Sequence, residues 1–266
     1  MRLSISNIGW ENEKDDLVYA YMKEAGFAGL EIAPTRIFPN NPYDEIKEAR
    51  NWSLDIKVKE GFDISSMQSI WYGRSENLFA TTEGRKALFE YTKKAIDFAE
   101  AINCGNLVFG CPRNRNVPDG YDVRSAHDIA VCFFKDLGEY AFSKGTVLSM
   151  EANPPIYNTN FINRTEEAIE LVNQVDSRGF LLNYDLGTAI ENNESLSVIA
   201  DNIKHINHVH ISEPGLKVIE KRQLHKELFD ILKTQKYEGY VSVEMGKQED
   251  ISNISRVIKY VSALNN

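Results

Sequence analysis

Short apolar runs alternate with longer amphipathic segments along most of the chain. Each run is rich in Val, Ile, Leu or Phe, which is typical of a strand buried on both faces. We expect eight such strands, at residues 3–8, 29–33, 56–60, 106–110, 146–151, 180–185, 206–211 and 240–244.

The segments between these runs carry apolar residues at helical spacing. They predict helices that include residues 16–25, 83–102, 126–143, 165–175 and 223–234. Strands that alternate with helices indicate repeated βα units around a parallel sheet. Eight units in 266 residues match a (β/α)8 TIM barrel, an α/β fold. No linker divides the chain, so we expect residues 1–266 to form a single barrel domain.

The longest predicted loops follow strands, at residues 62–82, 111–123 and 153–164. Such loops gather at the carboxyl-terminal face of a barrel, where the active sites of this architecture lie. We therefore look for functional residues at the carboxyl ends of the strands.

The last four predicted strands each end in a residue type that binds metal ions. These residues are Glu151, Asp185, His210 and Glu244. Any one of them alone is explained equally well as the solvated start of a loop, but four charged ends on four apolar runs are not. Consecutive strands of a barrel end side by side, so the four side chains can converge. Carboxylates with one imidazole suit a divalent cation such as Mn²⁺, Mg²⁺, Co²⁺ or Zn²⁺.

Composition narrows the partners of the chain. A formal net charge of −9 disfavours nucleic acid, because nucleic-acid binders usually present a basic surface. No apolar stretch is long enough to span a membrane, and the amino terminus lacks the pattern of a signal peptide. Three cysteines without a disulfide or CxxC pattern are typical of reduced thiols. We expect a cytoplasmic protein.

Four short motifs surround the expected ligands: Ser-Met-Glu-Ala-Asn, Tyr-Asp-Leu-Gly, His-Val-His-Ile-Ser-Glu and Val-Glu-Met-Gly. On these motifs the chain resembles the xylose isomerase-like barrel superfamily of sugar isomerases and epimerases, over essentially its whole length. That superfamily includes ketose 3-epimerases and, more distantly, endonuclease IV. The resemblance implies one metal held by the four residues above. It also implies that Glu151 and Glu244 act as acid and base on opposite faces of the substrate.

Two positions depart from the family pattern. Many members have His three residues after the strand-six Asp, where this chain has Thr188. The ketose 3-epimerases carry a Glu in the loop after strand five, where this chain has Tyr157 and Asn158. Both departures leave the metal ligands intact and disfavour ketohexose 3-epimerisation, so the identity of the sugar stays open.

Several further residues are candidates for contact with a substrate at the mouth. Glu60 ends the expected third strand, Gln68 follows it, Thr188 replaces the family histidine, and Glu213 closes the His-Val-His motif. Arg113 and Arg115, after the fourth strand, could together bind a phosphate or carboxylate, although a solvated loop explains them equally well.

Glu31, His208 and two aromatic residues each have two possible roles. Glu31, at the end of the second strand, either supports the rim or binds a substrate hydroxyl. His208 lies two residues before His210 and so shares its face, one layer down, where a hydrogen-bonded core role is favoured. Trp71 and Tyr72 either wall the site or pack within their loop.

The leading hypothesis is a metal-dependent isomerase or epimerase of a sugar, sugar phosphate or sugar acid, which moves a proton next to a carbonyl. A lyase, dehydratase or hydrolase on the same metal is the alternative, together with a barrel that binds sugar without turnover. An endonuclease IV-like nuclease is disfavoured, because that family builds its zinc site from many histidines and this chain has five. If the chain assembles, a symmetric homodimer is expected.

Overall fold

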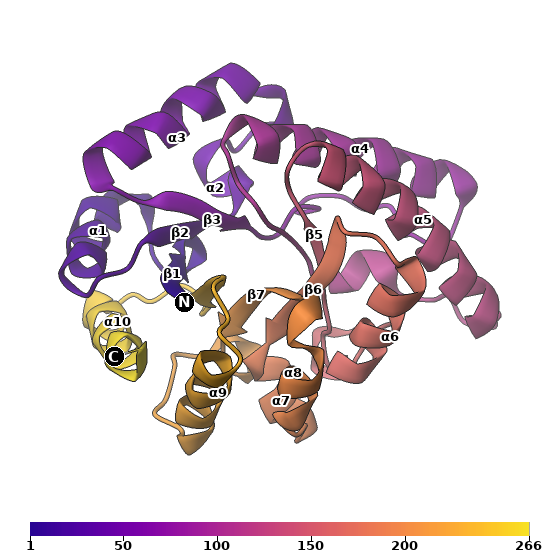
Figure 1. Ribbon diagram of the computed structural model, residues 1–266. Helices are drawn as coiled ribbons and strands as arrows, with labels where there is room; N and C mark the ends of the chain where they lie inside the picture. The colour runs from indigo at the N-terminus through magenta and orange to yellow at the C-terminus, as the bar shows by residue number, and fades with distance from the viewer. Residues whose placement is uncertain (266) are drawn as a thin grey trace.

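The computed structural model describes residues 1–265 and shows a closed barrel of parallel strands in the order β1 to β8 (Figure 1). The barrel closes because β1 pairs with β8 as well as with β2. This confirms the predicted (β/α)8 fold. The strands are β1 (Arg2–Ser6), β2 (Gly29–Ile32), β3 (Asp63–Met67), β4 (Leu107–Phe109), β5 (Leu148–Glu151), β6 (Phe180–Asp185), β7 (Ile206–Ile211) and β8 (Tyr240–Val243).

Helices surround the barrel and connect its strands. Two of them, α6 and α9, have the bounds that the sequence predicts, at residues 165–175 and 223–234. No helix within residues 1–265 is long and apolar enough to cross a bilayer. The helices are α1 (Asp15–Glu24), α2 (Pro34–Ile37), α3 (Ile46–Glu60), α4 (Thr82–Ala101), α5 (Val123–Ser143), α6 (Thr165–Val175), α7 (Leu186–Asn192), α8 (Ser197–Asn202), α9 (Gln223–Thr234) and α10 (Ile251–Asn265).

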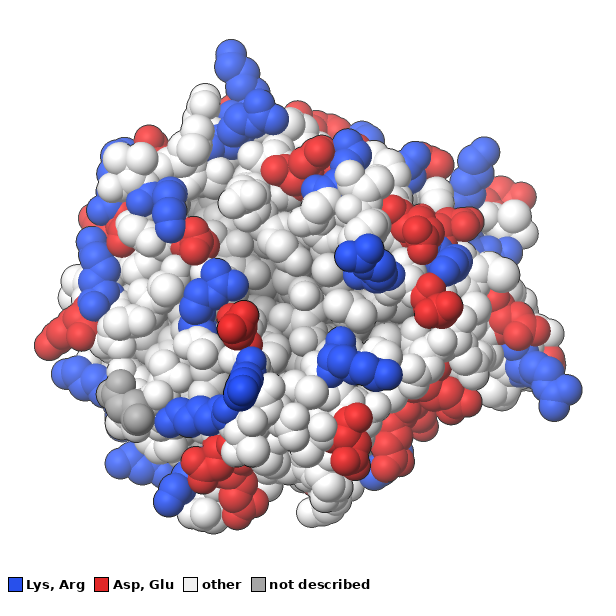
Figure 2. All heavy atoms as spheres, viewed as in Figure 1, with Lys and Arg blue, Asp and Glu red and all other residues white. Residues whose placement is uncertain are grey.

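The helices follow one another clockwise in Figure 1, from α1 on the left, over α4 at the top, to α10. Because crossovers between parallel strands are right-handed, this view has the amino-terminal ends of the strands toward the reader. Figure 2 takes the same view and shows acidic and basic side chains interspersed over this face. Mixed charges of this kind differ from the basic stripe of a nucleic-acid binder.

The third strand is not where the sequence predicts it. Residues 56–60 form the last turn and a half of α3, and β3 begins only at Asp63. The alternation of Ile56 and Val58 with lysines resembles a strand, but Val58 is 82% exposed on the helix surface. Gly61, in the left-handed conformation at φ 83°, ends the helix.

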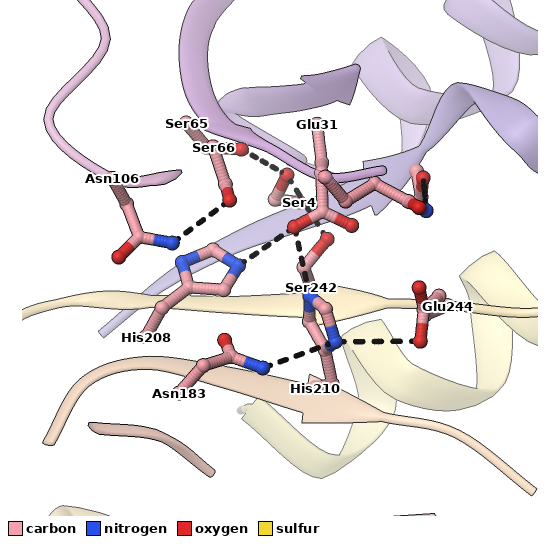
Figure 3. A network of polar contacts seen from close by, with 12 residues as sticks. Ser4, Glu31, Ser65, Ser66, Asn106, Asn183, His208, His210, Ser242 and Glu244 are labelled. Carbon is pink, nitrogen blue, oxygen red and sulfur yellow. Dashed lines mark hydrogen bonds and ion pairs between the residues drawn. The ribbon is translucent and has the colours of Figure 1, made fainter. Parts of the chain in front are cut away.

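Polar side chains fill much of the barrel interior, where branched apolar residues are the rule. The hydroxyl of Ser149 donates to Oδ1 of Asn106 over 2.6 Å, and Nδ2 of Asn106 donates to Ser66 over 2.9 Å. The hydroxyls of Ser4 and Ser65 lie 2.5 Å apart. Buried polar groups need such partners, and this network continues up to the residues at the mouth (Figure 3).

Candidate metal centre

The strand register brings the predicted ligands to one point of the barrel rim. Asp185 at the end of β6 pairs directly with His210 in β7, and Glu151 at the end of β5 pairs with Asn183. Glu244 follows β8, two residues beyond the pairing partner of His210. One ligand atom from each of the four residues lies within 4.8 Å of all the others.

His210 is held between two sets of carboxylates and is fully buried. Its Nε2 lies 2.8 Å from Oε2 of Glu31, and its Nδ1 lies 3.3 Å from Oε2 of Glu244 (Figure 3). Nδ1 also lies 2.9 Å from Oε1 of Glu151. Burial favours the neutral ring, but the charges of these carboxylates outweigh it and raise the pKa of His210 well above its usual value. Nε2 donates to Glu31, so Nδ1 is the atom that faces the cluster.

Glu31 lies one layer deeper in the barrel than the four clustered residues and is fully buried. Burial works against its charge, yet His210 and His208 together lower the pKa of Glu31 below its ordinary value. The Nε2 of His208 lies 3.1 Å from the same carboxylate oxygen. Glu31 and His208 thus form a buried support under His210, which fits the expected core role of His208.

The carboxyls of Asp185 and Glu244 are both at most 9% exposed. Burial, with the nearby charge of Glu151, raises the pKa of Asp185. Burial raises the pKa of Glu244 to about 7. Carboxylates gathered in a buried site repel one another and are costly to charge unless a cation compensates them. The donor set therefore fits a divalent cation of the hard or borderline class.

Amide side chains orient both oxygens of Glu151. Nδ2 of Asn183 donates to Oε1 over 2.7 Å, and Nδ2 of Asn153 donates to Oε2 over 3.1 Å. Gly110 lies against the same carboxylate, because a Cβ placed there would come within 2.8 Å of Oε2. Glu151 is therefore held in one position by three residues that the sequence did not single out.

Asp185 is oriented by Thr188 in α7 and by Ser212 just after β7. Its Oδ2 accepts hydrogen bonds from the backbone N (2.7 Å) and the hydroxyl (2.9 Å) of Thr188, and its Oδ1 accepts from the hydroxyl of Ser212. Thr188 is 1% exposed and also donates to the carbonyl of Ala152. Instead of facing a substrate, as we expected, Thr188 supports a ligand.

Of the other candidates, Gln68 does reach the mouth. It lines a cavity of about 180 Å³ together with Glu151, Asp185 and Glu244, and its Nε2 donates to Ser6 over 2.9 Å. The remaining wall of the cavity is formed by Ser69, Val108, Gly110, Cys111, Pro112, Asn153, Tyr157 and Leu216.

Two glutamates expected at the mouth are engaged elsewhere. Glu60 ends α3 on the outside of the barrel and pairs with Lys23 over 2.7 Å. It is not at the mouth because residues 56–60 are helical and do not form the third strand. Glu213 is 3% exposed and forms a two-pronged ion pair with Arg222, with N–O distances of 2.8 and 2.6 Å. Neither carboxylate lines the metal-end cavity.

The two arginines after β4 have different surroundings. Arg115 is fully buried and donates to the carbonyl of Glu151 (2.8 Å), Oδ1 of Asn153 (3.0 Å) and the carbonyl of Ile162 (3.2 Å). It therefore ties the loop after β4 to the loop after β5 and is not free to clasp an anion with its neighbour. Arg113 is exposed and lines a separate hollow beside the mouth.

Sequence reasoning missed Asn183, Asn153 and Ser212, which bind the ligand carboxylates. Each lies two residues from a predicted ligand: Asn183 from Asp185, Asn153 from Glu151 and Ser212 from His210. Side chains two residues apart along an extended chain point the same way, so each one lies beside its neighbouring ligand. That spacing was the available signal.

Comparisons with known proteins place the whole chain in this architecture. The structure of a D-psicose 3-epimerase matches with a TM-score of 0.79 and 16% identity over 100% of each chain. The 3-keto-D-glucoside 4-epimerase YcjR from E. coli matches with a TM-score of 0.76 and 17% identity over 99% of each chain. An AP endonuclease of family 2 from Brucella melitensis matches equally well, at 0.76 and 19% identity over 99% of each chain.

At these identities the structural likeness concerns the fold, which hosts several chemistries. A search of curated protein sequences finds no match. The sequence model of the xylose isomerase-like TIM barrel family matches residues 19–261. That match covers most of the chain, including all four clustered residues, and the chain therefore belongs to the xylose isomerase-like TIM barrel family.

Proposed function

We propose that the chain is a divalent-metal-dependent isomerase or epimerase of a carbohydrate. The observation that carries this proposal is the pair Glu151 and Glu244, whose carboxylates share one buried cluster but come from β5 and from the end of β8. Two intervening strands separate them on the rim, so they approach a substrate in the mouth from different sides. An acid and a base on two sides of one carbon are what inversion or isomerisation next to a carbonyl requires.

Each residue of the cluster has a distinct task in this proposal. Glu151, Asp185, His210 and Glu244 would hold the cation. When bound, the cation supplies Lewis-acid stabilisation of negative charge on a substrate oxygen. Glu151 and Glu244 exchange the proton: one removes it from the carbon next to the carbonyl, and the other returns a proton at the opposite face or the adjacent carbon.

Asn183 and Asn153 keep the Glu151 carboxylate in one orientation. This preorganisation lowers the entropy lost in reaching the transition state. The structural relatives named as epimerases of psicose and of a keto-glucoside support a sugar as the substrate class.

A nuclease of the endonuclease kind is less well supported. Three of the five histidines lie outside both the cluster and the Glu31–His208 pair beside it: His127 bonds Gln174, His225 bonds Tyr260, and His205 ends a short turn before β7. A multi-histidine zinc site cannot be assembled from the two that remain, His208 and His210.

Solvent deuterium uptake tests the proposal directly. The chelator-treated protein is supplied with Mn²⁺ or Co²⁺ and offered ketoses, keto-glycosides, sugar acids and sugar phosphates, and exchange of the proton next to the carbonyl is followed by NMR. We expect exchange with at least one compound, lost on chelation and in Glu151→Gln and Glu244→Gln. Glu60→Gln, a carboxylate on the outer surface, is the matched control and keeps full activity. Absence of exchange across the panel would contradict the proposal.

Metal content tests the ligand assignment separately. Glu151→Gln and His210→Ala, dialysed against Mn²⁺ or Zn²⁺, should each retain less than the roughly one equivalent of the parent protein. Full retention in both variants would show that the cation is held elsewhere, whatever the exchange experiment gives.

A further inference from the structure

The cavity lined by Glu151, Asp185 and Glu244, here called the metal end, is small. Its volume is about 180 Å³, below the range of roughly 300–1,000 Å³ that is usual for small-molecule sites. Ser69, which forms part of its wall, also lines two further hollows of about 610 and 520 Å³. Ser69 therefore stands in the wall of all three spaces, which places both hollows directly beside the metal end.

A short turn at residues 69–74 separates these two hollows. Backbone hydrogen bonds from Tyr72 N to Ser69 O (2.9 Å) and from Arg74 N to Trp71 O (3.0 Å) fix it, and Ser69 adopts the left-handed conformation at φ 56°. Trp71 anchors the turn, because its ring is 2% exposed and its Nε1 donates to Thr92 over 2.8 Å.

Tyr72 is presented outward by this anchored turn. Its side chain is 70% exposed and lines both hollows. Within residues 1–265 its ring has no aromatic or cationic partner, whereas the nearby ring of Tyr91 is covered by the guanidinium of Arg74 at 4.8 Å. An amphipathic ring with a free face, carried on an anchored turn, is well suited to contact a ligand, because a Tyr side chain has only two torsions to fix on binding.

The larger hollow is electrically balanced. Each of its three cations already has an acidic partner: Arg36 pairs with Asp15 (2.6 Å), Lys247 pairs with Glu11 (2.5 Å), and Arg74 pairs with Glu76. Uncommitted polar groups remain in the wall at Thr35 and Asn41. This chemistry matches a neutral polyhydroxylated group better than a phosphate or carboxylate.

We propose that the substrate is a glycoside or disaccharide: the reacting carbonyl sugar occupies the metal end, and its second, neutral unit lies past Ser69 in the larger hollow against Tyr72. This inference rests on the proposed function for the reaction at the metal end. It adds the substrate class and a specificity-determining residue that touches the unit remote from the chemistry. Binding energy from that remote unit would be used to position the reacting ring.

The first test compares two substrates that share a reacting ring. Deuterium exchange is measured for a keto-glucoside with a methyl aglycone and for the same ring with a glucosyl aglycone. We expect kcat/KM to be about tenfold higher for the glucosyl compound, the equivalent of one good contact. Tyr72→Ala should lower kcat/KM for the glucosyl compound about tenfold and so abolish that preference, and Tyr72→Phe should keep it. Phe142→Ala, an aromatic at the far end of α5 with 44% exposure, is the control.

The second test does not depend on turnover. The probe is the glucosyl compound with its keto group reduced to an alcohol, which has no exchangeable proton next to a carbonyl. Its binding to the Mn²⁺-supplied protein is followed by saturation-transfer NMR, and Tyr72→Ala should weaken that binding about tenfold. If no compound exchanges deuterium but Tyr72→Ala still weakens binding, the proposed function is wrong and the larger hollow with Tyr72 is supported as a carbohydrate-binding site.

Equal affinity of Tyr72→Ala and the parent protein for the reduced disaccharide would contradict the role of Tyr72 in binding, even if deuterium exchange is observed. A preference for a phosphorylated monosaccharide, lost in Arg113→Ala, would also overturn the proposal, because Arg113 lines the other hollow.

Discussion

Oε2 of Glu31 lies 2.8 Å from Nε2 of His210, deep in the barrel, and this contact fixes which ring nitrogen faces the mouth. The Nε2 proton is donated to the carboxylate, so Nδ1 is directed at the cluster. Carboxylates in this position orient metal-bound histidines and raise their basicity. In the proposed metal site, Glu31 would act on the ion through His210 and would not touch the ion itself.

The first prediction concerns Glu31→Gln. The amide oxygen can still accept the Nε2 proton, so the ring stays in place, but the negative charge that strengthens Nδ1 as a donor is lost. We expect Mn²⁺ affinity to fall about 10- to 100-fold, measured by calorimetric titration of chelator-treated protein. Glu60→Gln is the control on the outer surface. An unchanged affinity in Glu31→Gln would show that the contact has no effect on metal binding.

The second prediction concerns the pH dependence of stability without metal. Burial raises the pKa of Glu244 from 4.5 to about 7, so the folded chain holds a proton there that the unfolded chain has released. The stabilisation is complete below pH 4.5 and is lost as the pH rises through about 7, a loss of about 3 kcal/mol for this group. The raised pKa values of Asp185 and His210 act in the same direction.

The melting temperature of chelated protein should therefore fall by several degrees between pH 5 and pH 8, and Glu244→Gln should reduce that fall. Added Mn²⁺ should raise the melting temperature more at pH 8 than at pH 5, because protons compete for the ligand atoms. A melting temperature that stays level or rises with pH in the chelated protein would contradict this account.

The fold and the cluster could be predicted because the signals that carry them are local and repeated. Seven of the eight strands lie near their predicted positions, and each of the four ligand types sits at the carboxyl end of an apolar run. Barrel closure then brings those ends together, since neighbouring strands are parallel and in sequence order. Nothing beyond strand order was needed to expect Asp185 beside His210.

Other features depend on contacts that sequence spacing does not encode. Ile56 to Glu60 alternate like a strand, and only the continuation of α3 from Ile46 shows that they are helical. Arg115 and Arg113 are two residues apart in one motif, yet one is fully buried and the other exposed. That difference is set by the loop after β5, which folds over Arg115.

The third prediction uses those two arginines. Arg115→Met removes hydrogen bonds to two backbone carbonyls and to Asn153, and leaves the buried Oδ1 of Asn153 without its donor. We expect the free energy of unfolding to fall by about 2–4 kcal/mol in a urea titration. Arg113→Met, the same change on an exposed residue, should alter it by less than about 0.5 kcal/mol. Similar effects from both variants would contradict the structural role of Arg115.

The fourth prediction concerns Gly110, at the mouth beside Glu151. A methyl group there would lie 2.8 Å from Oε2 of Glu151, closer than a Cβ normally approaches any atom. The carboxylate cannot simply swing away, because Asn183 and Asn153 hold its two oxygens. Gly110→Ala should therefore displace Glu151 and lower the rate of deuterium exchange by about tenfold to a hundredfold. The backbone φ of Gly110 is not positive, so alanine brings no backbone strain.

Stability separates this local effect from general damage. The free energy of unfolding of Gly110→Ala should fall by no more than about 2 kcal/mol, because the backbone stays in place and only the amide hydrogen bonds to Glu151 are disturbed. Gly105→Ala is the matched control just before the other end of β4, since a Cβ there meets nothing within 4 Å. If Gly110→Ala exchanges deuterium at the parental rate while Glu151→Gln does not, the exact placement of the Glu151 carboxylate is not what limits the reaction.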